Sequence, residues 1–311
     1  MNKEDKIYIA GHRGMAGSAI MRKLREKGYT NLLYRTHSEL DLTRQEEVEH
    51  FFQTEKPDYV FLAAAKVGGI VANSTYPADF IYINTMIAAN VVHTAYKTGV
   101  KKLLNLGSSC IYPKLAPQPL KEEFLLTGPL EETNEAYAIS KIAAIRLCKH
   151  YNDQYGTNFI SLMPTNLYGP GDNYDLATSH VLAALIRKFH EGKVHGGPVV
   201  LWGDGSPRRE FLYSDDLADA AVYLMEQKDY KDIGEFVNVG TGKDIPIKDL
   251  SDLVAGIVGY EGKIEWDTSK PNGTPRKLLD VSRLSSLGWH YTTPLSEGIR
   301  KTYEEYRNMS I

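Results

Sequence analysis

Short apolar runs alternate with amphipathic stretches through the first half of the sequence, and this alternation limits the folds open to the chain. The runs expected to be strands are Ile7 to Gly11, Leu32 to Arg35, Tyr59 to Ala65, Leu103 to Gly107 and Phe159 to Met163. Helical patterns fill the intervals between them. Parallel neighbours in a sheet need a long crossover connection, which a helix supplies. The alternation therefore predicts an α/β fold with a doubly wound parallel sheet.

Beyond Met163 the pattern becomes irregular, and turn-rich stretches containing glycine and proline occur at 168–172, 203–207 and 270–275. With 311 residues the chain exceeds the usual size of one domain. We predict a large domain over residues 1–165 and a smaller α/β lobe over residues 166–311. Strands near residues 195–240 are expected to return to the large sheet, so that the two parts interleave.

Composition argues against several classes of function. The 36 basic and 39 acidic residues give a formal net charge of −3, so electrostatics favours neither nucleic acid nor a membrane surface as a partner. No apolar run reaches the roughly 18 residues that a membrane span needs, and no secretory leader pattern precedes the first strand, so we expect a cytoplasmic protein. The two cysteines, Cys110 and Cys148, form no CxxC pair, and no metal site is predicted.

Three glycines follow the first predicted strand and open the first helix. A tight turn without Cβ atoms lets backbone N–H groups and a helix N-terminus face a pyrophosphate. In this strand–loop–helix setting the loop predicts a dinucleotide site and a Rossmann-type sheet, with a plain structural turn as the alternative. The residues expected to contact the cofactor here are Gly11, His12, Arg13, Gly14, Met15, Ala16 and Gly17.

The residues after the second strand favour NADP(H) over NAD(H). A site selective for NAD usually has Asp or Glu at the end of this strand, about 20 residues beyond the glycines. This chain has the sequence Tyr-Arg-Thr-His at 34–37 instead. Arg13, together with Arg35 or His37, offers positive charge suited to a 2′-phosphate, although solvated side chains are the alternative.

A tyrosine and a lysine four residues apart open a long predicted helix. Tyr137 and Lys141 share one helix face, so both side chains can reach one ligand. A phenol is a poor acid or base at neutral pH unless a nearby cation favours its phenolate, and Lys141 can supply that field. The pair follows Ser108 by one strand–helix unit, which makes a chance occurrence on an exposed helix face a weak alternative.

The glycine loop, Ser108, Tyr137 and Lys141, in this order and spacing, resemble the extended short-chain dehydrogenase/reductase family. The resemblance implies NADP binding in the large lobe, a nucleotide sugar in the C-terminal lobe and a Ser–Tyr–Lys catalytic triad. It also implies further cofactor contacts from Asp41, Leu42, Lys141, Pro164, Asn166, Leu167 and His180.

Longer strings at 64–70, 107–114, 164–170, 179–182, 209–212 and 273–280 are similar to one branch of that family. Its members invert two carbons beside the ketone of a GDP-linked 4-keto-6-deoxy sugar and then reduce the ketone with NADPH. Inversion requires a base on one face of the carbon and an acid on the other. The resemblance assigns these two roles to Cys110 and His180.

The same resemblance implies substrate contacts and an assembly. The residues that match substrate-binding positions are Asn166, Lys188, Trp202, Arg209 and Asn272. A homodimer is expected through two long helices, at 77–99 and 135–155, that pack as a four-helix bundle.

Several alternatives stay open. A simple 4-epimerase needs no Cys110 and His180 pair, and a 4,6-dehydratase usually has two acidic residues after the triad serine, where this chain has Ser109 and Cys110. A non-catalytic NADP-binding module has no use for Tyr137 and Lys141. Taken without the resemblance, Cys110 is more readily interpreted as a small buried apolar residue, the commonest role of a free cysteine.

Overall fold

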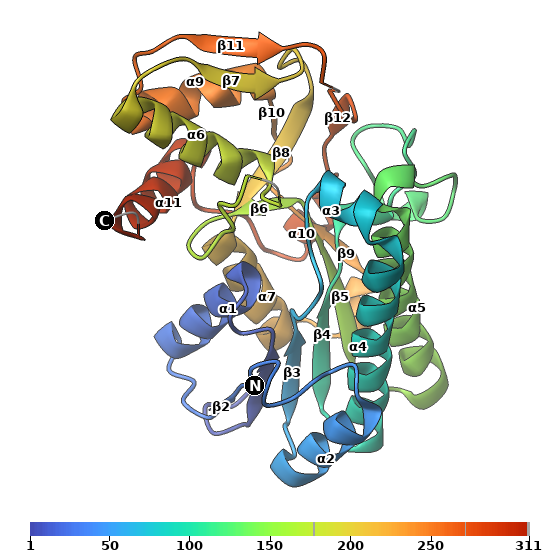
Figure 1. Cartoon of the computed structure of the whole chain (residues 1–311). Coiled ribbons are helices and arrows are strands. Elements are labelled where there is room, and N and C mark those ends of the chain that lie inside the picture. Colours follow the sequence, from blue (N-terminus) through green and yellow to red (C-terminus); the bar gives the residue numbers. More distant parts are fainter. Residues whose placement is uncertain (177, 271, 310–311) are drawn as a thin grey trace.

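A six-stranded parallel sheet forms the centre of the structure, a computed structural model that describes residues 1–176, 178–270 and 272–309 (Figure 1). The strand order is β2-β1-β3-β4-β5-β9, and every neighbouring pair is parallel. The strands are β1 (Ile7–Ala10), β2 (Leu32–Leu33), β3 (Tyr59–Leu62), β4 (Lys102–Leu106), β5 (Phe159–Pro164) and β9 (Val237–Val239). The predicted α/β class with its doubly wound parallel sheet is confirmed.

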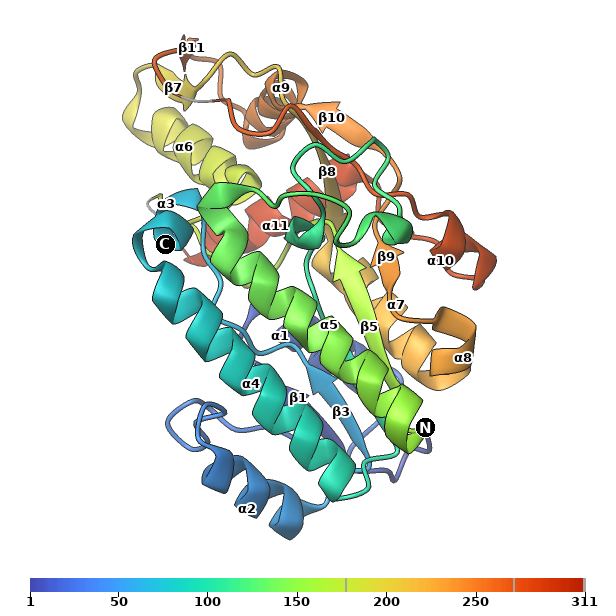
Figure 2. The same cartoon turned by 90° about the vertical axis from the view of Figure 1, so that its right-hand side faces the viewer.

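Helices cover both faces of this sheet (Figure 1). One face carries α1 (Met15–Glu26) and α7 (Ser214–Gln227), which pack against each other. The other face carries α2 (Gln45–Glu55), α4 (Pro77–Lys97) and α5 (Glu135–Tyr155). Figure 2 shows α4 and α5 running side by side along their length, as the two long helices of the sequence prediction. None of the described helices is both long and apolar enough to cross a membrane.

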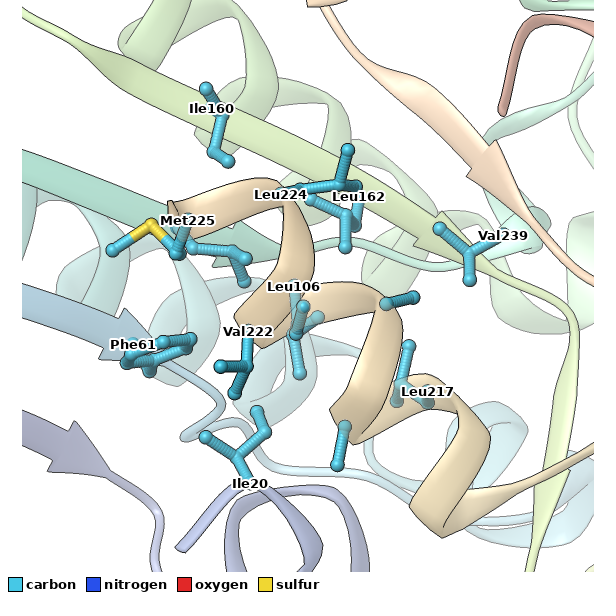
Figure 3. Close-up of a cluster of buried hydrophobic side chains, with 14 of the residues drawn as sticks. Ile20, Phe61, Leu106, Ile160, Leu162, Leu217, Val222, Leu224, Met225 and Val239 are labelled. Carbon is cyan, nitrogen blue, oxygen red and sulfur yellow. The ribbon is translucent and has the colours of Figure 1, made fainter. Parts of the chain in front are cut away.

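Successive strand residues point to opposite faces, so each strand contributes to two hydrophobic cores. In β1, Ile7 and Ile9 face α1 and α7, whereas Tyr8 and Ala10 face the layer of α2, α4 and α5. Figure 3 shows the first core, where Val222 and other side chains of α7 lie over residues from several strands. The near-continuous burial of β4 and β5 follows from this double coverage.

A smaller lobe lies beyond the carboxyl ends of the parallel strands (Figure 1). Its strands are β6 (Asn166–Tyr168), β7 (Val199–Trp202), β8 (Arg208–Tyr213), β10 (Asp244–Pro246), β11 (Ile264–Asp267) and β12 (Arg276–Lys277). Here β8 pairs with β6, β10 and β12, and β7 pairs with β11. The lobe's helices are α6 (Val181–His195), α9 (Ile247–Val258) and α11 (Leu295–Met309), and they enclose a core of their own.

Three short helices complete the architecture: α3 (Ile70–Thr75), α8 (Tyr230–Ile233) and α10 (Ser282–Ser286). The chain crosses into the smaller lobe at β6 and returns through α7 and β9 to the large sheet. A boundary at residue 165 stays a prediction. Since β2 and β3 lie on opposite sides of β1, the strand order reverses at β1, and ligands of such sheets bind at this point, beyond the carboxyl ends of the strands.

Candidate active site

The glycine loop brings three backbone segments into close contact. Gly11 follows β1 with φ of +86°, and a Cβ atom there would lie 2.7 Å from the backbone nitrogen of Ala64. A Cβ atom on Gly17 would lie 2.2 Å from the carbonyl oxygen of Gly11. Gly14 is the N-cap of α1 and offers no capping side chain, so the first N–H groups of the helix stay open to an anionic ligand. Met15 and Ala16 form the first turn of α1 beside it.

A cavity of about 450 Å³ adjoins this loop at the end of β2. It is lined by His12, Arg13, Leu32, Leu33, Tyr34, Arg35, Thr36 and Glu39. The centre of the His12 ring lies 4.8 Å from that of Tyr34, with the two rings tilted by 39°, and the His12 Nδ1 atom is buried without a hydrogen-bond partner in the described part of the chain. A cavity in this place, with an unpaired ring nitrogen and two cations, fits the adenosine half of a dinucleotide.

Other residues predicted to contact the cofactor have partners within the protein. Arg35 forms an ion pair with Glu55 at 2.6 Å. His37 is largely exposed, with Nδ1 3.8 Å from a carboxylate oxygen of Asp41. Leu42 is buried. His37, Asp41 and Leu42 are not among the residues that line the cavity.

The connection between β5 and β6 holds the remaining predicted cofactor residues at the junction of the lobes. Pro164 ends β5, and Asn166 and Leu167 begin β6. The side-chain amide of Asn166 donates to the backbone carbonyl of Glu210 at 2.8 Å, which ties this connection to β8. Neighbouring residues from both lobes therefore meet beside the sheet's carboxyl edge.

The predicted triad residues come together at the end of β4. Ser108 caps the short 3-10 helix Ser109–Ile111 directly after that strand, and Tyr137 and Lys141 lie in the first turns of α5. Lys141 Nζ lies 5.7 Å from the centre of the Tyr137 ring and donates to the carbonyl of Leu106 at 2.8 Å. Burial lowers the pKa of Lys141 to about 8. Burial raises the pKa of Tyr137, and a hydrogen bond with Ser108 opposes this rise.

Cys110 is buried next to this group. Its backbone N–H donates to Ser108 Oγ at 3.4 Å. Burial raises the pKa of the Cys110 thiol, whereas the positive charges of Lys277 and Lys141 act to lower it. These two ammonium groups partly offset the effect of burial, so the thiol pKa is raised less than burial alone would raise it.

His180 is the N-cap residue of α6, and its side chain is exposed. Desolvation by surrounding protein lowers the pKa of the imidazole, and the charge of Lys277 lowers it further. Because Lys277 acts on both Cys110 and His180, the three groups occupy one region between the lobes. The 3-10 helix after β4, the N-cap of α6 and strand β12 therefore converge there.

Two residues of this region carry no role in the sequence prediction. Lys277 belongs to β12, and its own pKa is lowered by burial. Asn134 precedes α5, and its Oδ1 atom is buried without a partner in the described part of the chain. Both line a small cavity of about 50 Å³ together with Cys110. Lys277 stands inside one of the family-like strings, but no spacing in the sequence indicates that it faces Cys110.

The predicted substrate residues spread over the smaller lobe. Arg209 lies in β8, where desolvation lowers the pKa of its guanidinium group, and it lies close enough to Lys277 to affect that ammonium. Lys188 Nζ donates to the carbonyl of Val200 at 2.8 Å. Trp202 is 58% exposed. Asn272 accepts a hydrogen bond from the backbone of Asp204 at 2.9 Å, which fixes the loop before β12.

Comparison with known proteins places this arrangement in a family. The sequence pattern of the NAD dependent epimerase/dehydratase family matches residues 7–240. GDP-L-fucose synthase 1 of Arabidopsis thaliana is 60% identical over 306 residues, covering 98% of this chain and 94% of the relative. GDP-L-fucose synthase of Escherichia coli K12 is 53% identical over 311 residues, covering 98% of this chain and 97% of the relative.

Solved structures agree with the sequence relatives. A GDP-mannoheptose C4 reductase from Campylobacter jejuni with NADP bound has a TM-score of 0.92 and 44% sequence identity, and the match covers 99% of both chains. The resemblance inferred from the motifs is therefore confirmed. The chain belongs to the NAD dependent epimerase/dehydratase family and, within it, groups with the GDP-L-fucose synthases.

Proposed function

We propose that this chain is a GDP-L-fucose synthase. It converts GDP-4-keto-6-deoxy-D-mannose to GDP-L-fucose by inverting C3 and C5 and then reducing the C4 ketone with NADPH. The observation that carries this proposal is the position of Cys110, buried one short turn after Ser108 and exposed to the charges of Lys277 and Lys141. A site for reduction and a site for proton abstraction thus coincide.

The inversions use Cys110 and His180 from two sides of the sugar. The Cys110 thiolate takes the proton from the carbon beside the ketone, so a C–H bond breaks, an S–H bond forms and negative charge moves to the ketone oxygen. Hydrogen bonds from Tyr137 and Ser108 stabilise that oxygen. His180, as imidazolium, returns a proton to the opposite face, and solvent restores both groups.

The reduction uses the triad residues at the same oxygen. NADPH, when bound, would supply a hydride to C4. Tyr137 gives its phenolic proton to the resulting alkoxide, and Ser108 holds the oxygen in place. Lys141 keeps a positive charge near the Tyr137 ring. The glycine loop, with no room for a Cβ atom, and the cavity beside His12 are the features of this chain that fit the nucleotide.

The competing activities fit these contacts less well. A 4-epimerase returns the hydride to the same carbon and needs no acid–base pair beside the ketone, so the Lys277 charge facing Cys110 would serve no purpose. A 4,6-dehydratase requires carboxyl groups after the triad serine, where Ser109 and Cys110 stand. A module that only binds NADP needs neither Tyr137 nor Cys110.

We also infer a cytoplasmic homodimer. Two free cysteines fit a reducing compartment. The paired helices α4 and α5 carry exposed large apolar side chains, among them Tyr82 and Ile139, which a second copy of the chain would cover. Sedimentation of the wild type is expected to give twice the chain mass, and Tyr82→Glu is expected to shift it toward monomer.

The proposed function is tested by the ratio of NADPH consumed to GDP-L-fucose formed. Protein, NADPH and GDP-4-keto-6-deoxy-D-mannose are mixed, and the loss of reduced-nicotinamide absorbance is compared with the product formed. One NADPH consumed per GDP-L-fucose supports the synthase. A 4-keto product inverted at C3 or C5 with NADPH untouched, or no reaction at all, contradicts it.

A further inference from the structure

The cavity for the adenosine half of the cofactor contains a carboxylate that the sequence pattern did not indicate. Glu39 lines this cavity together with Arg13, Arg35 and Thr36. We propose that Glu39 is a specificity-determining residue, which competes with the 2′-phosphate of NADP(H) and accepts from the ribose hydroxyl of NAD(H). The proposal rests on the function proposed above only in taking this cavity as the nicotinamide-nucleotide site.

Glu39 occupies the hydrogen-bond donors that a phosphate oxygen would use. The backbone N–H and the hydroxyl of Thr36 both donate to the same Glu39 carboxylate oxygen, each at 2.7 Å. These two hydrogen bonds lower the pKa of Glu39. A 2′-phosphate oxygen seeks the same kind of donors, so Glu39 stands in for it when the cavity holds no phosphate.

The nearby cations do not all remain available to a phosphate. Arg35 is engaged by Glu55 and also donates to the carbonyl of Tyr34 at 2.9 Å. Arg13 forms no ion pair within 4.0 Å with any residue of the described ranges, and its charge acts on Glu39 across the cavity. Arg13 therefore attracts the phosphate, while Glu39 repels it.

Glu39 has the opposite effect on NAD(H), whose adenosine ribose carries a 2′-hydroxyl in place of the phosphate. A carboxylate near the end of the second strand is the usual acceptor for the 2′-hydroxyl of NAD. Glu39 reaches this place from farther along the chain, because the backbone turns between Thr36 and Glu39. The preference between the two cofactors is thus a balance between Arg13 and Glu39.

Nucleotide binding to the variant Glu39→Gln tests the proposal. Dissociation constants for NADPH and NADH are measured by fluorescence titration without any sugar substrate, and those for 2′-AMP and 5′-AMP by calorimetry. Glutamine keeps an oxygen for Thr36 but removes the charge. We expect NADPH and 2′-AMP to bind about tenfold more tightly, because a like-charge contact is lost. NADH is expected to bind about threefold more weakly, because a neutral amide is the poorer acceptor.

Glu46→Gln is the matched control, since it removes an equal charge from an exposed position outside the cavity. It should leave the ratio of the two dissociation constants unchanged. Glu39→Ala should shift the ratio in the same direction as Glu39→Gln, and a thermal melt of each variant verifies folding. An unchanged ratio in both Glu39 variants, or a ratio shifted toward NADH, overturns the proposal. Because no sugar is present, this result is independent of whether the chain makes GDP-L-fucose.

Discussion

At the scale of single residues, Lys277 and Glu39 matter because of where the fold brings them. Lys277 reaches Cys110 only after β12 pairs with β8. Glu39 reaches Thr36 through a local turn after β2. The sequence rule for cofactor choice looks for an acidic residue at the end of that strand and therefore does not identify Glu39. The closeness of Tyr137 and Lys141, by contrast, was predictable, because helix geometry alone fixes the two residues relative to each other.

The charge of Lys277 should set the pH at which Cys110 works. Its ammonium lowers the thiol pKa, which burial raises. Lys277→Met should therefore move the pH profile of solvent-deuterium exchange at C3 and C5 upward, by about one pH unit. Lys277→Arg should keep the profile near that of the wild type. If Lys277→Met raises KM but leaves the pH profile unshifted, Lys277 contributes to substrate binding and does not set the Cys110 pKa.

At the scale of secondary-structure elements, β8 organises the site through a buried carboxylate. Glu210 is fully buried and accepts backbone hydrogen bonds from Thr241, Gly242 and Leu279 at 2.6 to 2.8 Å. These bonds join β8 to the turn after β9 and to the segment that carries Lys277. Burial raises the Glu210 pKa, and the three N–H groups oppose the rise.

Glu210→Gln should loosen this junction. One of the three backbone donors would then face an amide N–H₂ group, so a buried donor would lose its partner. We expect the free energy of unfolding to fall by about 2–3 kcal/mol in urea titrations. The control Glu265→Gln removes only an exposed ion pair with Lys263 and should cost less than about 0.5 kcal/mol. Equal free energies of unfolding for the Glu210 variant and the control would show that these Glu210 hydrogen bonds do not stabilise the junction.

At the scale of the whole molecule, we propose that the large lobe holds the cofactor and that the smaller lobe holds the sugar nucleotide. The sheet was predictable from the alternation of apolar runs, because central strands such as β4 and β5 are buried on both faces. The smaller lobe was not predictable in detail. Its strands are short, and β8 pairs with β6, β10 and β12 across long intervals of sequence, so only tertiary contacts fix their register.

If the two lobes hold different ligands, an Arg209 variant should lose affinity for only one of them. Arg209→Met removes a desolvated guanidinium from β8 in the smaller lobe. KM for the GDP-sugar should rise about tenfold or more, because a charge-assisted contact to the diphosphate is lost. The dissociation constant for NADPH should stay unchanged. Arg146→Met, which breaks a half-buried ion pair with Glu235 in the large lobe, should change neither quantity. A matching loss of NADPH affinity in the Arg209 variant would argue against separate lobes for the two ligands.

We expect Cys110 to perform the inversions beside a reductive triad, and turnover in deuterium oxide by Cys110→Ser tests this role most directly. GDP-L-fucose from the wild type should carry solvent deuterium at C3 and C5. The serine variant should incorporate deuterium at neither carbon and make no GDP-L-fucose, yet bind NADPH as the wild type does, because a hydroxyl is far harder to ionise than a thiol. Full GDP-L-fucose output with deuterium at both carbons from Cys110→Ser would contradict the account.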